Sequence, residues 1–239
     1  MKPDKRRQAL WSNEYEHLQG IRLGYTESRP PSVELFLACE KESGRTFERI
    51  LDVGCGKGRI GLHLALEGRS VTGFDFAPAA LEAFAETAAK HRVDNLITHF
   101  RQDIGKPWNL PDLSFDAVFA VTVVDNLTHK DGLLHFRGEI LRVLAPGGLF
   151  VLEFYLRDDG YYGPLLGKSP DRESGLLVDP NNGITFALHS RDDLVSLFER
   201  ELTILSSETL RFESLKYGKL YRRRSQVIVF EKQAPNSSA

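Results

Sequence analysis

The chain has 239 residues, of which 41% are hydrophobic and 27% are charged, with 31 basic residues against 33 acidic ones. This composition supplies one large core and excludes the weakly hydrophobic, strongly charged composition of disordered chains. A formal net charge of −2 argues against a protein whose main task is to neutralise nucleic-acid phosphates. Two cysteines, Cys39 and Cys55, are too few for a disulfide scaffold, and no C-x-x-C pair could hold zinc.

No apolar run approaches the roughly 20 residues that span a bilayer. The first residues, MKPDKRRQALWSNEYEHL, lack the apolar stretch of a secretory signal. We therefore expect a soluble, cytoplasmic protein without a membrane partner.

Short β-rich apolar runs alternate with helical segments from residue 48 onwards. The expected strands are 48–54, 70–75, 96–103, 114–124 and 147–155, and the expected helices are 59–68, 77–92 and 130–144. Each crossover helix must cover an apolar face of the sheet through a right-handed connection. The alternation therefore predicts a doubly wound α/β fold with a mostly parallel sheet.

One segment then interrupts the alternation before the chain closes. Residues 156–189 contain five Gly and three Pro in 34 residues, a composition and length typical of a functional lid or substrate loop. A helix at 190–200 and strands at 201–212 and 225–232 would close the sheet. We expect a single domain over 1–232, made of a helical cap (1–45), a cofactor-binding core (46–155), the lid (156–189) and the closing elements (190–232), followed by a disordered tail (233–239).

The segment LDVGCGKG places glycines at a strand-to-helix turn, where a ligand can approach the backbone and the free N–H groups of the helix. Gly56, Gly58 and Gly61 also satisfy G-x-G-x-x-G, and Asp75 follows Gly56 by 19 residues, as in a dinucleotide site. However, an acidic residue, Asp52, ends the strand, and its carboxylate would repel a pyrophosphate. The carboxylate would suit a ligand with an ammonium group and no phosphate, such as S-adenosylmethionine.

Five motifs in order carry a family resemblance: LDVGCGKG, VTGFDF, FRQD, FDAVFAV and LRVLAPGGLFVLEF. Together they resemble the class I S-adenosylmethionine-dependent methyltransferases over residues 48–155. The resemblance implies a Rossmann-like, seven-stranded sheet whose last strand is antiparallel, and S-adenosyl-L-methionine as the cofactor.

The resemblance also implies roles for individual residues near the cofactor's methionine portion. Asp52, Gly54, Cys55 and Gly56 would lie beside it, with Asp52 near the amino group. Val121, with Thr122 after it, would run past the sulfonium.

Other residues would surround the adenosine. Asp75 would accept hydrogen bonds from both ribose hydroxyls. Phe76 would pack on the adenine face, and Asp103, with Ile104 beside it, would accept from the exocyclic amine.

Simpler interpretations of these residues remain open. Asp75 and Asp103 could be helix or turn caps, and Phe76 an ordinary core aromatic. Cys55 is better explained as a small filler in a tight turn than as a reactive thiol, since only Lys57 and Arg59 nearby would lower its pKa.

The methyl acceptor should lie beyond the carboxyl end of the fourth strand, beside the segment VDNLTH. Asp125, Asn126 and His129 are the candidate catalytic residues there, and His189 is a further candidate base. A cap or surface role is the alternative for His129. The segment departs from the N-P-P-Y or D-P-P-Y pattern of enzymes of this family that methylate amino groups of nucleic acids and protein glutamine, so amide and base-amine acceptors are disfavoured.

Acceptor recognition should come from outside the shared core. The candidate aromatic residues are Trp11, Tyr15, Tyr25, Tyr161 and Tyr162. An N-terminal helix packed on the sheet, without ligand contact, is the alternative for the first three. The basic cluster Lys216, Lys219, Arg222, Arg223 and Arg224 is read as solvated hairpin charge, with acidic-substrate binding as its alternative.

These observations predict an enzyme that moves a methyl group to an oxygen, sulfur or nitrogen nucleophile of a small molecule, acting as a monomer or homodimer. The alternatives are a protein or tRNA methyltransferase, an NAD(P)-dependent oxidoreductase and a cofactor-binding protein without catalysis.

Overall fold

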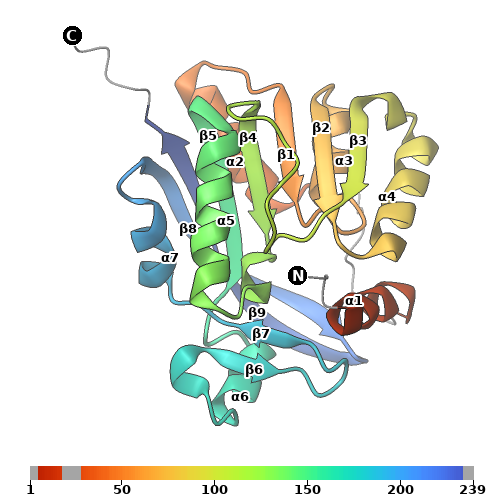
Figure 1. The fold of residues 1–239 in the computed structure, drawn as a ribbon, viewed down its shortest axis with the longest axis vertical. Helices are drawn as coiled ribbons and strands as arrows, with labels where there is room; N and C mark the ends of the chain where they lie inside the picture. Colours follow the sequence, from red (N-terminus) through yellow and green to blue (C-terminus); the bar gives the residue numbers. More distant parts are fainter. Residues whose placement is uncertain (1–4, 18–27, 234–239) are drawn as a thin grey trace.

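A computed structural model of the protein describes residues 5–17 and 28–233. Its centre is a seven-stranded sheet in the order β3-β2-β1-β4-β5-β9-β8 (Figure 1). The strands are β1 (Arg49–Val53), β2 (Ser70–Asp75), β3 (Ile97–Arg101), β4 (Phe115–Val121), β5 (Leu144–Tyr155), β8 (Leu202–Lys216) and β9 (Lys219–Lys232). The first five are parallel, and β9 runs antiparallel to both β5 and β8. The expected doubly wound sheet with an antiparallel last strand is confirmed.

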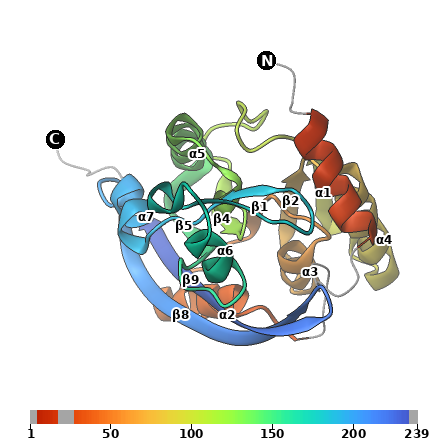
Figure 2. The ribbon, with the colours of Figure 1, turned by 90° about the horizontal axis from the view of Figure 1, so that it is seen from below.

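Helices cover both faces of this sheet (Figure 2). On one face, α2 (Pro31–Ser43), α3 (Arg59–Leu66) and α4 (Pro78–His91) share a buried apolar cluster with the strands. On the other face, α5 (Lys130–Val143) and α7 (Arg191–Phe198) share a second cluster. Because both faces are buried at the centre of the sheet, β1 and β4 are mostly apolar, whereas the edge strand β3 has exposed polar residues, Thr98, His99 and Arg101.

The last two strands form a longer hairpin than the sequence predicts. The expected strands 201–212 and 225–232 are extended by residues 213–216 and 219–224. Tyr217 and Gly218 form the two-residue turn, with φ of 49° and 74°, the positive values that tight hairpin turns require. The sequence did not predict this extension, because the residues near the turn are mostly polar or basic and lack the alternating apolar pattern of a strand.

The segment 156–189 is folded rather than a simple loop. It contains α6 (Tyr162–Gly167) and a two-stranded sheet of β6 (Leu176–Val178) and β7 (Thr185–Ala187) around its own small apolar cluster. Figure 1 shows this unit below the carboxyl ends of the parallel strands, on the same side as α1 (Lys5–His17). Its role as a lid stays a prediction.

Some expectations fall on residues outside the described ranges. Tyr25 and the end of the expected tail, residues 234–239, are among them. None of the described helices is long and apolar enough to cross a membrane.

We expect Phe150→Ala to lower the free energy of unfolding by about 3 to 5 kcal/mol, because it removes a large ring from a packed site. The Phe150 side chain has no exposed surface, and its ring centroid lies 5.0 Å from Phe198 and 5.8 Å from Phe230. Urea denaturation measures the change. In the control Leu205→Ala, the altered side chain is 42% exposed and the expected change is within about 0.5 kcal/mol. Equal losses in both variants would contradict this account of the core.

Candidate functional site

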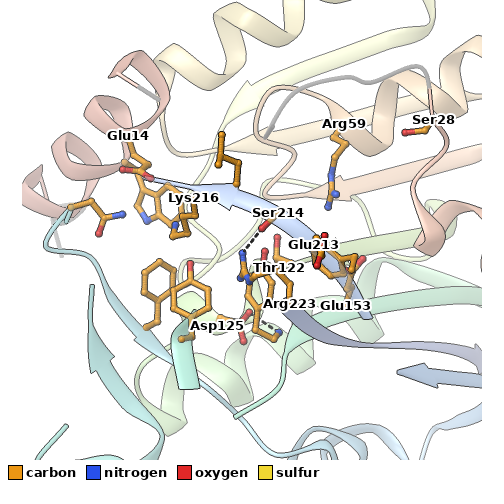
Figure 3. A pocket seen from close by; sticks show the side chains of 17 residues that line it. Glu14, Ser28, Arg59, Thr122, Asp125, Glu153, Glu213, Ser214, Lys216 and Arg223 are labelled. Atoms are coloured by element: carbon orange, nitrogen blue, oxygen red, sulfur yellow. Dashed lines mark hydrogen bonds between the residues drawn. The ribbon is translucent and has the colours of Figure 1, made fainter. Parts of the chain in front are cut away.

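Two adjoining cavities lie at the carboxyl ends of the parallel strands. The smaller has a volume of about 80 Å³ and the larger about 270 Å³. Trp11 from α1 and Thr122, directly after β4, line both. The cavities therefore meet at these two side chains. Figure 3 shows the larger cavity, with Thr122, Asp125 and Arg223 near one another and Lys216 beside Glu14.

The glycine loop between β1 and α3 lies against the smaller cavity, where its glycines present backbone atoms without side chains. Gly54 has φ of 64°, and a Cβ there would lie 2.3 Å from Cγ2 of Val123. Gly56 has φ of 53°, and its N–H donates to Oδ2 of Asp75 at 3.0 Å. A side chain at either glycine would collide with a neighbour or strain the backbone. Of the two, Gly54 lines the cavity.

Two residues of the predicted methionine set face the protein interior. Asp52 is 2% exposed, and its Oδ2 accepts from the N–H of Gly61 in α3 at 3.0 Å. Burial raises the pKa of Asp52 to about 7. Cys55 is also buried, with Sγ close to Gly73, and burial raises the pKa of its thiol. Neither residue lines the two cavities.

Asp75 is the buried acceptor of the smaller cavity. Its Oδ1 accepts from the N–H of Ala77 at 2.9 Å, and its Oδ2 accepts from Gly56. Burial outweighs these bonds and raises the pKa of Asp75 to about 6. Each carboxylate oxygen keeps a second lone pair, so two further hydrogen bonds can reach it from the cavity.

The remaining predicted adenosine residues line the same smaller cavity. Phe76 follows Asp75, and the guanidinium of Arg7 lies 5.6 Å from its ring centroid. Asp103 is half-buried, and its Oδ1 accepts from the N–H of Gly105 at 2.9 Å. Ile104 and Val121 are buried apolar walls. This acceptor and apolar set fits a nucleoside: carboxylates for hydroxyls and an amine, and flat apolar surface for a base.

Thr122 marks the junction of the two cavities with a rare backbone conformation. Its φ is 53°, a left-handed value that is strained for a β-branched residue. The N–H of Thr122 donates to the carbonyl oxygen of Glu153 in β5 at 2.7 Å, which holds the strained turn. A strained backbone conformation of this kind is kept where neighbouring contacts hold it in place, and such conformations are common at ligand sites.

The three candidate catalytic residues do not line one common space. Asp125 lies in a short 3-10 helix, Val124–Asn126, and lines the larger cavity. Asn126 lines the smaller cavity and an open groove of about 830 Å³. His129 is exposed at the start of α5 and lines only that groove among the three spaces.

Asp125 is the most perturbed of these groups. Its Oδ2 accepts from the N–H of Tyr155 at 3.2 Å, while Oδ1 has no hydrogen-bond partner among the described residues. Burial raises the pKa of Asp125 well above its usual range. The other candidate base, His189, is half-buried, and burial lowers its pKa.

Sequence reasoning missed how α1 forms a wall of the site. Gln8 Nε2 donates to the carbonyl oxygen of Phe76 at 2.9 Å, and Arg7 Nη2 donates to that of Asn126 at 2.6 Å. The Lys57 ammonium donates to the carbonyl oxygen of Tyr15 at 2.8 Å. These bonds hold α1 across the strand ends, where Trp11 and Tyr15 line the smaller cavity.

Sequence reasoning also misjudged part of the basic cluster. Lys216 and Arg223 are each 5% exposed and line the larger cavity, whereas Lys219 and Arg222 are exposed. The only indication in the sequence that Lys216 faces inward is the alternation of side chains along β8, which puts Ser214 and Lys216 on the same face of the strand. Arg59, at the start of α3, lines the larger cavity too.

Comparisons with known proteins agree with this geometry. Residues 50–148 match the family model described as a methyltransferase domain. A sterol 24-C-methyltransferase of Gibberella zeae is 29% identical over 163 residues, which cover 68% of this chain and 41% of that protein. A demethylmenaquinone methyltransferase of Thermus thermophilus is 39% identical, over 48% of this chain and 51% of that protein. The chain thus spans about half the length of these curated relatives, or less.

A solved structure shows the same fold over nearly the whole chain. It is the 1,6-didemethyltoxoflavin-N1-methyltransferase of Burkholderia thailandensis, which was crystallised with 1,6-didemethyltoxoflavin and S-adenosylhomocysteine. The TM-score is 0.67 at 18% identity, covering 96% of this chain and 88% of that one. Residues 50–148 thus match a methyltransferase domain, and this match, the sheet order and the glycine loop beside Asp75 support the resemblance of the chain to the class I S-adenosylmethionine-dependent methyltransferases.

Proposed function

We propose that the protein transfers a methyl group from S-adenosylmethionine to an oxygen, sulfur or nitrogen nucleophile of a small molecule. The observation that carries this proposal is the pair of cavities that meet at Thr122 and Trp11. A site with hydrogen-bond acceptors and apolar surface for a nucleoside, beside an adjoining cavity of about 270 Å³, suits a donor and a small acceptor held side by side.

In this proposal the smaller cavity holds the cofactor's adenosine. Asp75 accepts from the ribose hydroxyls, Asp103 accepts from the adenine amine, and Phe76 covers the base. Arg59 faces the larger cavity from the end of the glycine loop and pairs with the cofactor's carboxylate. When bound, the cofactor supplies a methyl group activated by its sulfonium.

The chain's own contribution is to orient the acceptor and exclude water. Orientation at attack distance can lower the barrier by several kcal/mol, on the order of 7 or more in the best cases. Asp125 faces the larger cavity close to the junction at Thr122. Burial raises the pKa of Asp125, which favours its neutral form, and in this proposal the carboxyl group donates a hydrogen bond to the acceptor and positions it.

A macromolecular acceptor is the second candidate, and one observation favours it. The open groove of about 830 Å³ is lined by the basic residues Arg6, Arg7 and Lys106, next to the smaller cavity. The groove is separate from the cavity that Asp125 lines, so the small-molecule acceptor is preferred. We also propose a cytoplasmic location, with which the two buried free thiols, Cys39 and Cys55, are compatible.

Calorimetry with S-adenosylhomocysteine tests the cofactor site. We expect Asp75→Ala to weaken binding by about tenfold to 100-fold or more, because hydrogen bonds to a charged acceptor are worth about 1.5 to 3 kcal/mol. The control Asp116→Ala removes a carboxylate paired with Arg49 at the opposite end of the strands and should leave binding unchanged. Binding of NADH but not of S-adenosylhomocysteine would favour the oxidoreductase alternative.

Transfer of labelled methyl groups tests the acceptor class. The purified protein should label components of a cell extract from which macromolecules have been removed. Label that appears only in the protein or RNA fraction would instead support the macromolecular acceptor. Cofactor binding without any labelling would support a non-catalytic role.

Cofactor affinity should depend on pH through Asp75. The ionised carboxylate accepts from both ribose hydroxyls, so affinity is complete above the pKa of about 6 and falls as the pH drops through it. Calorimetry between about pH 8 and about pH 5 measures this dependence. Asp75→Asn should bind weakly at every pH. If the affinity of Asp75→Asn for the cofactor depends on pH as strongly as that of the unaltered protein, a group other than Asp75 titrates.

Variants of Asp125 separate positioning from base catalysis. If Asp125 positions the acceptor as a donor, Asp125→Asn retains methyl transfer to the labelled small molecule within about fivefold, whereas Asp125→Ala loses about tenfold to 100-fold. A loss of more than about 100-fold in Asp125→Asn would indicate a general base. Initial rates at varied acceptor concentration measure the effect.

A further inference from the structure

Two cationic side chains form part of the wall of the larger cavity. Lys216 near the end of β8 and Arg223 in β9 are each 5% exposed, although both belong to a hairpin at the edge of the sheet. Ser214 lies on the same face of β8, two residues before Lys216, and its Oγ accepts from Nη1 of Arg223 at 3.2 Å. Both cations therefore face the same cavity, where Figure 3 shows Lys216 beside Glu14 and Arg223 beside Ser214.

The carboxylates that neutralise these cations do not line the cavity. Asp159 and Asp179 are fully buried, and neither is among the residues that line the larger cavity. Arg223 Nε donates to Oδ2 of Asp159 at 2.8 Å, while its Nη2 has no hydrogen-bond partner among the described residues. The Lys216 ammonium lies 3.8 Å from Oδ2 of Asp179, beyond hydrogen-bond distance.

Free donors outnumber free acceptors on this wall. Nε1 of Trp11 is, with Nη2 of Arg223, the second buried donor of this wall without a partner among the described residues. Among the acidic residues of the wall, Glu14 accepts from the hydroxyl of Tyr217 at 3.1 Å, and Glu153 accepts from that of Ser225 at 2.9 Å. Glu213 is exposed, and Oδ1 of Asp125 is the one buried carboxylate oxygen of the wall without a partner among the described residues. Buried donors without partners are costly, so a ligand that supplies charged acceptors would be favoured.

Aromatic side chains form another part of the wall. Tyr162 and Phe186, whose ring centroids are 4.9 Å apart, come from the folded segment 156–189. Trp11 meets Phe186 edge-on, with centroids 6.1 Å apart. The Lys216 ammonium lies 5.5 Å from the ring centroid of Tyr162, and the Arg223 guanidinium lies 5.2 Å from it. Apolar rings thus stand directly beside the two cations.

We propose that the methyl acceptor carries a carboxylate, which Lys216 and Arg223 hold while Trp11, Tyr162 and Phe186 cover an aromatic or apolar body. This inference rests on the proposed function and names the class of acceptor for the same site. It also assigns the β8–β9 hairpin as the element that selects the acceptor.

Calorimetry on the full chain saturated with S-adenosylhomocysteine tests the inference, with benzoate and the nearly isosteric, neutral benzamide as probes. A ligand of this size should bind with a dissociation constant on the order of 1 to 10 mM. Benzamide should bind at least about tenfold more weakly than benzoate, because it lacks the charge that the two cations hold. Inorganic phosphate is the third probe and should bind more weakly than benzoate.

Two variants should remove the preference for benzoate. Lys216→Met replaces the ammonium with an apolar group of similar length. Arg223→Lys keeps a charge opposite Asp159 but removes the unpaired Nη2, so it tests the site without breaking that ion pair. The matched control Lys219→Met alters an exposed cation of the same hairpin and should keep the preference. All variants should bind S-adenosylhomocysteine within about twofold of the unaltered protein.

The inference is overturned if benzamide binds as well as benzoate, if benzoate does not bind, if phosphate binds more tightly, or if the preference survives in both variants. A large loss of S-adenosylhomocysteine affinity in the variants would also overturn it, because the cations would then serve the cofactor. If the unaltered protein does not bind S-adenosylhomocysteine at all, the proposed function fails instead.

Discussion

The burial of the parallel strands on both faces is the constraint on which this molecule depends. Helices α2, α3 and α4 cover one face, and α5 and α7 cover the other, so side chains along the strands must be apolar. Polar groups can approach a ligand only where the strands end. Asp75 and Thr122 stand at or directly after two of those ends, and Asp103 follows a third. The position of the site is thus a consequence of how the sheet is buried.

At this edge the glycine loop and the buried carboxylates stabilise each other. Asp75 lies in a place where burial disfavours its charge, and the N–H groups of Gly56 and Ala77 offset part of that cost. The same bonds fix the loop against the end of β2. Asp52 fixes α3 against β1 in the same way, because its carboxylate accepts a hydrogen bond from the N–H of Gly61. The carboxylate of Asp75 therefore lines the cavity and that of Asp52 holds the scaffold, although Asp75 is the last residue of β2 and Asp52 the last but one of the neighbouring β1.

The second half of the site is built from parts that the sheet does not require. Helix α1, the folded segment 156–189 and the β8–β9 hairpin converge on the larger cavity from three separate stretches of chain. These three elements pack against an aromatic cluster around Tyr161 and Tyr162, and this cluster is separate from the two main apolar clusters of the sheet. The walls of the larger cavity can therefore vary with little effect on the sheet, because they depend on a small apolar cluster of their own.

The sequence by itself determined the features that follow from local rules. Alternating strands and helices, a glycine turn and an acidic residue at a strand end have short-range signatures, so the sheet and the residues Asp75, Phe76, Asp103 and Ile104 around one cavity were predictable. Only the tertiary structure decided which distant segments meet there. Arg223 pairs with Asp159, 64 residues away, and Tyr217 with Glu14, 203 residues away, and no local pattern encodes such partners. Likewise, Asp125 and His129 are four residues apart yet face different spaces. The short 3-10 helix that carries Asp125 ends at Asn126, and both Leu127 and His129 are extended, so the two residues do not share a helix face.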